Sequence, residues 1–188
     1  MSRTVAAKLA FAAALLPYPL RRFARGESGA TAVEFGLVAA PFLALLLALV
    51  QTAIVFLAER VLDSIVAQAG RYIMTGQAQL ANMTQSQFAT YVCQNTYGLF
   101  NCSNFMINVQ NYGSFSAAVT SAPTLTFNAQ GQVTNTFNYD PGSPGSIVVL
   151  QVMYQWPIML GPLGFNLSNL SNGNRLLMAT AAFKNEPY

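Results

Sequence analysis

Histidine is absent from this sequence of 188 residues, and only two cysteines occur. Histidine is the side chain used most often for general acid–base catalysis. Its absence, together with so few cysteines, also leaves too few ligands for a zinc site. The sequence has no glycine-rich phosphate loop, and Asp140 and Glu186, the carboxylates of the C-terminal region, are far apart in it. We therefore expect no enzymatic activity, no metal site and no cofactor.

Charged residues are also scarce, at 8% of the chain, against about a quarter in ordinary soluble domains. From Tyr72 to the C-terminus the charged side chains are Asp140, Arg175, Lys184 and Glu186. Most of the basic residues precede residue 35, namely Arg3, Lys8, Arg21, Arg22 and Arg25. A nucleic-acid interface needs basic residues gathered on the folded domain, so we expect no nucleic-acid partner.

A long uncharged apolar segment covers residues 35–58. As a helix it spans about 36 Å, enough to cross a hydrocarbon core of about 30 Å. The consecutive leucines at 45–47 point in different directions, so the segment is apolar on every face, which favours a transmembrane helix over a buried core helix. The basic residues before it place the N-terminus in the cytoplasm. The C-terminal region is then periplasmic or extracellular.

The helix is expected to continue beyond the membrane segment. Apolar residues recur at helical spacing from Val61 to Ile73, with polar residues between them, which indicates a helix that packs one face on a domain. Gly76 fits a C-terminal cap. We predict one helix from about Ala30 to Thr75, kinked at Pro41 because proline removes a backbone hydrogen bond.

The region after this helix has the patterns of a small α+β domain. Thr84 and Gln87 have the spacing of a capping box at the start of a short helix. Alternation predicts strands at 105–110 and 147–156, and the mostly apolar first half of the latter indicates a central position. Weaker strand candidates are 124–127, 134–139 and 175–183, and turns are expected at 140–145 and 161–164. The expected organisation is a basic leader (1–29), a long helix (30–76) and a mainly antiparallel exported domain (77–188).

Cys93 and Cys102 are the two cysteines of the chain. In an exported domain such a lone pair predicts a disulfide. The alternative is two buried thiols.

The entry to the apolar segment holds an unusual acid, Glu34, which follows Gly29 by five residues and precedes Phe35. Ionisable side chains at the edge of a membrane helix are costly and mark function by default. The plain alternative is that Glu34 simply lies among the lipid headgroups.

The string from Gly29 to Phe42, together with Ala67–Arg71, resembles the start of TadE-like proteins of the tight-adherence (Tad/Flp) pilus system. The resemblance is clear over residues 29–76 and loose beyond, where it rests on residues 147–156 and 183–187. Gly29 and Glu34 match the signal of type IV pilins, in which a prepilin peptidase cuts after the glycine. The resemblance implies cleavage between Gly29 and Ala30, with Glu34 as the fifth mature residue.

The resemblance also implies a pilin-like fold and a non-enzymatic role as a minor pilin or assembly pseudopilin in surface attachment. The implied partners are other pilus subunits, the envelope assembly machinery, the prepilin peptidase and membrane lipid. The implied location is the bacterial inner membrane, crossed once, or an extracellular pilus. Our hypothesis for Glu34, within the Glu34–Phe35 pair, is that it meets the amine of a neighbouring subunit and fixes register more than it adds stability.

Two alternatives remain open at this point. The chain can be a membrane-anchored adhesin or ligand-binding module that is never cleaved. The leader can also be an ordinary signal peptide with residues 9–16 as its apolar part, although two prolines and three arginines follow that part closely. The N-terminus of the mature protein separates these possibilities.

Overall fold

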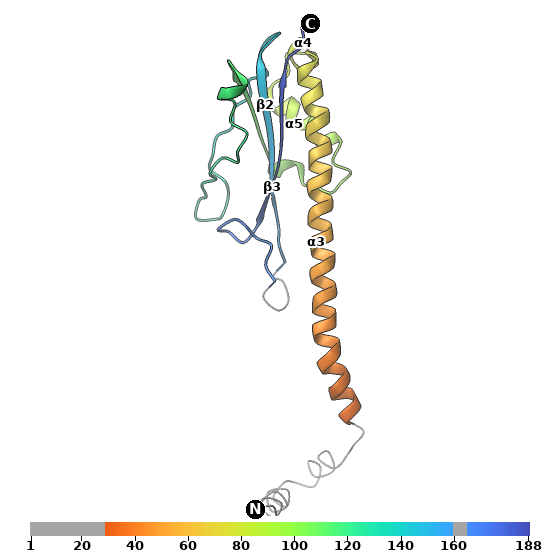
Figure 1. Cartoon of the computed structure of the whole chain (residues 1–188). Coiled ribbons are helices and arrows are strands. Elements are labelled where there is room, and N and C mark those ends of the chain that lie inside the picture. The colour runs from red at the N-terminus through yellow and green to blue at the C-terminus, as the bar shows by residue number, and fades with distance from the viewer. Residues whose placement is uncertain (1–28, 160–164) are drawn as a thin grey trace, which may run out of the picture. The chain divides into compact units, whose positions relative to one another are not determined.

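The computed structural model (Figure 1) describes residues 29–159 and 165–188. The predicted leader up to residue 28 and the predicted turn at 161–164 lie outside the described residues. The chain divides into two compact units, residues 1–46 and 47–188. In chain order the main elements are α3 (Ala30–Met74), α4 (Gln77–Leu80), α5 (Gln85–Gln94), β1 (Phe105–Tyr112), β2 (Ile147–Trp156) and β3 (Arg175–Lys184). A long helix followed by a small antiparallel sheet confirms the predicted α+β class.

Helix α3 confirms the predicted long helix and is assigned as continuous through Pro41. It ends at Met74. The turn that follows contains Gly76, which has a φ of 78° and whose N–H donates to the carbonyl of Ile73 over 2.9 Å. This left-handed backbone favours glycine. The Tyr188 ring also occupies the place that a Cβ at residue 76 would need. The C-terminal residue of the chain therefore packs on the turn that stops the helix.

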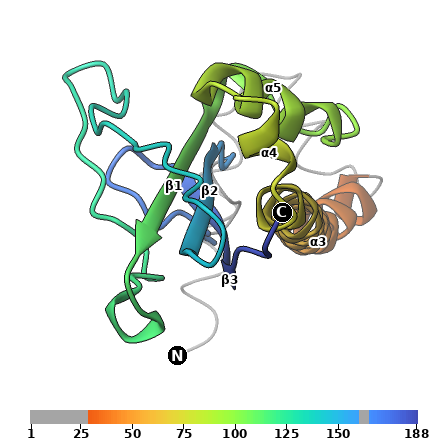
Figure 2. The ribbon, with the colours of Figure 1, turned by 90° about the horizontal axis from the view of Figure 1, so that it is seen from above.

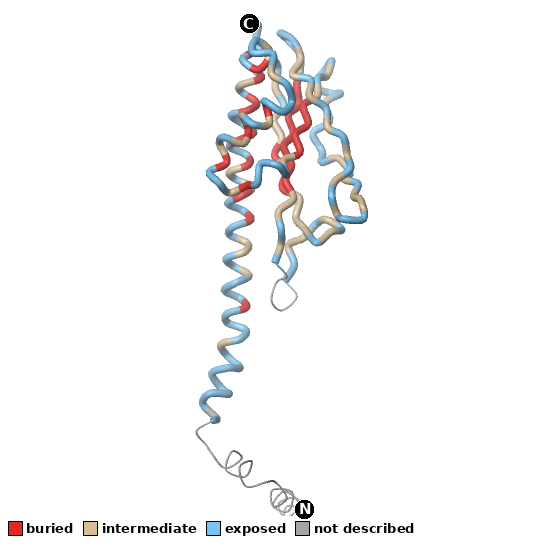
Figure 3. The backbone as a smooth tube through the Cα atoms, turned by 180° about the vertical axis from the view of Figure 1, so that it is seen from behind, coloured by how far each residue is buried: buried red, intermediate tan, exposed pale blue. Residues whose placement is uncertain are grey.

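The second unit has its core between α3 and the sheet. One face of α3 from Val55 to Ile73 is buried, as the helical spacing predicted. Figure 3 shows the buried residues gathered on the sheet and on the adjacent part of this helix. The largest fully buried side chains of that helix are Leu62, Ile65, Val66 and Ile73. Burial of such side chains contributes about 1.5–3 kcal/mol each.

The sheet has the order β1-β2-β3, and both neighbouring pairs are antiparallel. Strand β2 is central, as predicted from its apolar first half. Figure 2 shows α3, α4 and α5 on one side of this sheet and the chain between β1 and β2 on the other. The helix side carries the apolar core residues Ile107, Val109, Val148, Leu150, Val152, Leu177 and Ala179.

The opposite side of the sheet carries a buried polar pair. Asn108 and Gln151 lie directly across from each other on β1 and β2, and the Asn108 Nδ2 atom donates to the Gln151 Oε1 atom over 3.1 Å. Gln151 also donates to the carbonyl of Ser121 (3.0 Å), and the N–H of Asn138 donates to Asn108 (3.1 Å). The pair therefore fastens the connection between β1 and β2 to the sheet.

Two predicted strands, 124–127 and 134–139, are wrong. Each segment forms one isolated bridge, Phe127 with Val133 and Tyr139 with Val109. The reason is local competition by side chains: the N–H of Thr126 donates to the Asn135 Oδ1 atom over 2.7 Å. Asn and Thr side chains commonly divert backbone groups in this way. The weak candidate at 175–183 is in contrast a full strand, β3.

Helix α5 leads into a disulfide-closed loop. Thr84 and Gln87 form the predicted capping box, with reciprocal bonds between each side chain and the other's backbone N–H. After α5, a disulfide joins Cys93 to Cys102, whose Cα atoms are 5.6 Å apart. The predicted bridge is therefore present, and it fixes the end of α5 close to the start of β1.

Candidate functional site at the start of helix α3

The start of α3 is exposed on all sides. Phe35 is 74% exposed, Leu37 is 72% exposed and Val38 is 70% exposed. The same holds for most large apolar residues onward to Leu57. The helix is long and apolar enough to cross a membrane. A helix that is apolar all round needs lipid or other helices around it.

Glu34 lies within this apolar surface and is exposed. It occupies the position one helical turn after Ala30, the first residue of α3. Residues four apart share one face of a helix. The Glu34 carboxylate therefore lies on the same face of the helix as Ala30, one turn further along. Phe35 follows it directly. Gly29 directly precedes α3, and Glu34, Phe35 and Pro41 lie in the first turns of that helix. The Cys93–Cys102 bridge belongs to the other unit.

Gly29 has no steric role in the described structure. A Cβ placed on it would meet no other atom within 4 Å. Gly76 differs, because its left-handed φ of 78° and the Tyr188 ring both require glycine there. The fold therefore explains Gly76 and leaves the glycine at 29 without a structural reason.

An ion pair that the sequence did not reveal lies just after the apolar segment. The Arg175 Nη2 atom at the start of β3 is 3.1 Å from the Glu59 Oε1 atom on α3, and Arg175 Nη1 donates to the carbonyl of Leu167 over 3.2 Å. The two side chains are 28% and 31% exposed. No local signal could have linked residues that are 116 positions apart. The pair fastens the beginning of β3 to α3.

A cluster of aromatic rings joins α3, α5 and the segment before β2. Tyr72 stacks on Tyr91 with ring centroids 4.3 Å apart, and Phe88 packs against Tyr139 at 5.3 Å. Burial, with a smaller contribution from Tyr72, raises the pKa of Tyr139 to about 12. Burial also raises the pKa of Tyr91. Both phenols therefore stay protonated near neutral pH, and the cluster is structural.

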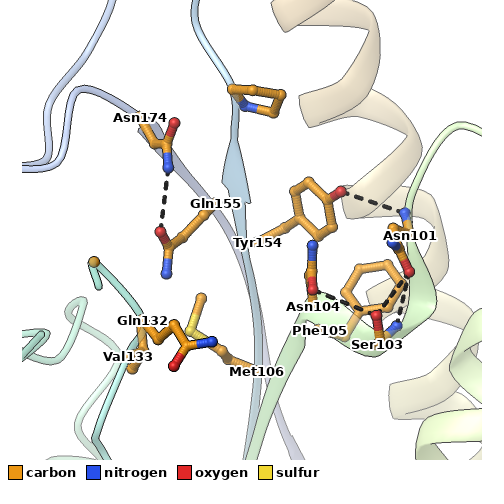
Figure 4. Close-up of a pocket in the computed structure, with 12 residues that line it drawn as sticks. Asn101, Ser103, Asn104, Phe105, Met106, Gln132, Val133, Tyr154, Gln155 and Asn174 are labelled. Atoms are coloured by element: carbon orange, nitrogen blue, oxygen red, sulfur yellow. Dashed lines mark hydrogen bonds between the residues drawn. The ribbon is translucent and has the colours of Figure 1, made fainter. Parts of the chain in front are cut away.

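A pocket of about 570 Å³ opens beside the disulfide loop, at the end of the sheet where β1 begins and β2 ends. Figure 4 shows the amides of Gln155 and Asn174 on one side of it and Asn101, Ser103 and Asn104 on the other. Its lining holds no charged side chain. Such a pocket suits a neutral polar ligand and offers no acid or base. Among residues 29–159 and 165–188, no group of three or more Cys, Asp or Glu could hold a metal ion.

Comparison with known proteins gives a family match over most of helix α3. Residues 29–71 match the family model described as TadE-like protein. The match begins at Gly29 and covers α3 almost to its end. It confirms, over these residues, the resemblance predicted from the sequence. No curated protein and no solved structure matches the chain.

Proposed function

We propose that this protein is a non-enzymatic, minor pilin-like or pseudopilin-like component that helps to assemble a Tad/Flp-type pilus used in surface attachment. The match to TadE-like proteins over residues 29–71 supports this role. The exposed apolar start of α3 supports it independently, because such a surface requires a membrane and can then exchange lipid for neighbouring helices.

The processing step rests on Gly29. It stands directly before α3 and five residues before Glu34, at a position where the fold has no need of a glycine. A prepilin peptidase reading this signal would cut between Gly29 and Ala30 and remove the basic leader. The domain organisation we propose is then a leader of residues 1–29, a membrane-anchoring helix of residues 30–76 and an exported domain of residues 77–188.

In this proposal Glu34 also has a role in subunit association, in addition to being part of the processing signal. After cleavage the new amine of Ala30 lies one turn from Glu34. In a packed assembly the Glu34 carboxylate of one subunit meets the Ala30 amine of the next. Desolvation offsets much of the attraction between such charges, so the pair selects register rather than adding much stability.

Intact-mass measurement of protein extracted from the membranes of pilus-assembling cells tests the processing step. We expect a chain that begins at Ala30, while the unprocessed chain has a mass of 20.2 kDa. Gly29→Val should leave the full-length chain. Gly36→Val is the matched control, because residue 36 is another glycine with nothing within 4 Å of an added Cβ, and it should still be processed. A wild-type chain that retains residues 1–29 contradicts the proposal.

A second candidate function is a membrane-anchored adhesin or ligand-binding module that keeps its leader. The observation that favours it is the uncharged pocket beside the disulfide loop. The same mass measurement separates the two, because only the pilin-like role requires an N-terminus at Ala30.

A further inference from the structure

Strands β2 and β3 lie beside helix α3 (Figure 1), and hydrogen bonds fix the level of their ends along it. The Arg175 Nη2 atom at the start of β3 is 3.1 Å from the Glu59 carboxylate, and the N–H of Glu186, just past β3, donates to the carbonyl of Met74 over 2.9 Å. Strand β3 therefore runs in the same direction as α3. Strand β2 runs in the opposite direction and pairs Trp156 with Arg175, so β2 ends near the level of Glu59.

The chain beyond β2 continues along the apolar part of α3. The Gln51 Nε2 atom donates to the carbonyl of Met159 over 3.1 Å. Gln51 precedes Glu59 by eight residues in the sequence, which is about 12 Å along the helix. A hydrocarbon core takes about 20 residues of helix, and every stretch of that length within the uncharged segment 35–58 includes residue 51. With α3 across a membrane, the carbonyl of Met159 therefore lies at the level of lipid.

The polar side chains of the apolar segment are bonded in a way that suits lipid. Gln51 and Thr52 are the polar residues of segment 35–58. The Thr52 hydroxyl donates to the carbonyl of Ala48 over 2.8 Å, and Gln51 donates to the carbonyl of Met159. Lipid offers no water to such groups, so a donor or a backbone carbonyl without a partner is costly there. The bond from Gln51 reduces this cost for both elements.

The residues after β2 present an apolar surface at this end of the sheet. Residues 157–165 include no charged side chain and no polar one. Met159 is 79% exposed, Phe165 is 40% exposed and Ile158 is partly exposed. We call these three residues the tip of the β2–β3 connection. On the neighbouring helix Leu57 is also exposed. The tip is thus bonded to a helix whose own outer surface is apolar, and a medium that surrounds this helix also meets the tip.

Charged side chains begin at the level where β2 ends. Glu59 pairs with Arg175 there, and the exposed pair of Arg60 and Asp63 follows on α3, with 3.3 Å between the charged atoms. Charged groups are costly in hydrocarbon and stable among headgroups or in water. This distribution places the membrane surface near Glu59 and the tip on its lipid side. Protein segments of this kind enter the boundary between headgroups and acyl chains to a depth of about 5–10 Å.

We propose that the tip formed by Ile158, Met159 and Phe165 inserts into the nearer leaflet of the bilayer beside α3, as a second membrane contact of this chain. A single helix leaves the sheet free to rotate about the helix axis. Contact at two places holds the sheet in one orientation on the membrane surface. The proposal rests on the proposed function only for the placement of α3 across the membrane.

Cysteine accessibility on the full-length chain tests the insertion. The chain is placed in vesicles of phosphatidylcholine and phosphatidylglycerol, with so little protein that copies rarely meet. Met159→Cys should react with a water-soluble maleimide about tenfold more slowly than Leu80→Cys, as expected when large apolar side chains are buried. Leu80 is the matched control, because it is 69% exposed and belongs to α4, which follows the other end of α3. Equal reaction rates at the two positions overturn the proposal.

Quenching by brominated lipids tests whether lipid is what covers the tip. A fluorophore on Met159→Cys should be quenched more by bromine near the headgroup than by bromine near the end of the acyl chain. A fluorophore on Leu47→Cys, 61% exposed in the middle of the apolar segment, should show the opposite preference. Quenching at position 47 alone overturns this proposal and leaves the proposed function standing. Absence of quenching at both positions contradicts the membrane anchor and both proposals.

A second copy of this chain is the other possible cover of the tip. In that case Met159→Cys chains should form disulfide-linked dimers in the same vesicles, without quenching by lipid. That result overturns the proposal.

Two phenylalanine substitutions test the contribution of the tip's side chains. Phe165→Asp should lower the quenching at position 159 at least about twofold, because a carboxylate is costly in lipid. Phe115→Asp is the matched control. Phe115 is 57% exposed and follows the end of β1 that pairs with the start of β2, at the opposite end of the sheet from the tip. It should leave the quenching unchanged. Equal quenching in the two variants overturns the proposal.

Discussion

The two parts of helix α3 belong to the same regular helix but have different surroundings. From Thr31 to Leu46 nearly every side chain is exposed, and Phe35 and Leu37 are each more than 70% exposed. From Val55 to Ile73 one face is buried against the sheet, and Leu62 is 1% exposed. The apolar residues of the first part cover every face, whereas those of the second part form one stripe. The difference shows that the arrangement of apolar residues, rather than their number, determines whether a helix is suited to lipid or packs on a protein core.

The largest expected difference between the two parts of α3 is the effect of a leucine-to-alanine substitution on the free energy of unfolding. Leu62→Ala should lower the free energy of unfolding of the second unit by about 2–5 kcal/mol, because it leaves a cavity in the core. Leu46→Ala, in the exposed part, should leave that free energy within about 0.5 kcal/mol of the wild type. Urea unfolding in detergent micelles, followed by the fluorescence of the single tryptophan, Trp156, measures both. Equal losses would contradict the division of α3.

The disulfide should stabilise only the second unit. Replacing Cys93 and Cys102 together by serine should cost about 2–3 kcal/mol of unfolding free energy, because a short closed loop is lost from the unfolded state. Insertion of α3 into membranes should not change. The same urea unfolding, with and without a reductant on the wild-type chain, provides the check. A reductant that changes nothing would mean that the bridge is not formed in the purified protein.

Gly36 and Gly70 allow a comparison in which a smaller effect on stability is expected. A Cβ on Gly70 would lie 3.2 Å from the Cβ of Ala181 and 3.1 Å from the Phe183 ring, whereas one on Gly36 would meet nothing within 4 Å. Gly70→Ala should therefore lose about 1 kcal/mol of domain stability through overpacking. Gly36→Ala should leave that stability unchanged, because residue 36 lies in the first unit and an added Cβ meets no neighbour there. The same unfolding assay decides, and a stabilising Gly70→Ala would show that the contact between α3 and β3 is looser than described.

The smallest expected effect is the alkaline sensitivity of the second unit. The pKa of Tyr139 is raised to about 12 by burial, above its ordinary value of 10.0. Stability from the protonated phenol is therefore fully present below pH 10 and is lost as the pH rises towards 12. Tyr139→Phe should unfold less readily than the wild type over this window and should be at least as stable at pH 7, because the buried Tyr139 hydroxyl has no hydrogen-bond partner among the described residues. Thermal unfolding at pH 7 and pH 11 measures this, with Tyr97→Phe, at an exposed position, as the control.

Long periodic patterns made most of the fold predictable from the sequence. The apolar run and the spacing that follows it gave α3 to within a residue or two, and alternation gave β2 with its bounds. The segments around Phe127 and Phe137 also alternate, yet their amide and hydroxyl side chains bind the local backbone instead of a neighbouring strand. Alternation alone does not reveal this competition.

The part of the candidate site formed by residues close together in the sequence was predictable. Gly29, Glu34 and Phe35 lie within two turns and follow from the motif. The pair between Glu59 and Arg175 depends on which distant segments meet. A sequence pattern also cannot show that residues 138–140 bind the edge of β1 at Val109.

The most direct test of the central proposal, that the exposed start of α3 is an assembly surface, is the behaviour of Glu34→Gln. Co-purification with other pilus subunits, measured together with intact mass, should show normal cleavage after Gly29 and normal membrane insertion but loss of association. Glu34→Asp, which keeps the carboxylate, should retain part of the association. Loss should follow because the Ala30 amine is left without its counter-charge in a poorly solvated interface. Undiminished co-purification of the Glu34→Gln chain would contradict the proposed role of this residue in assembly.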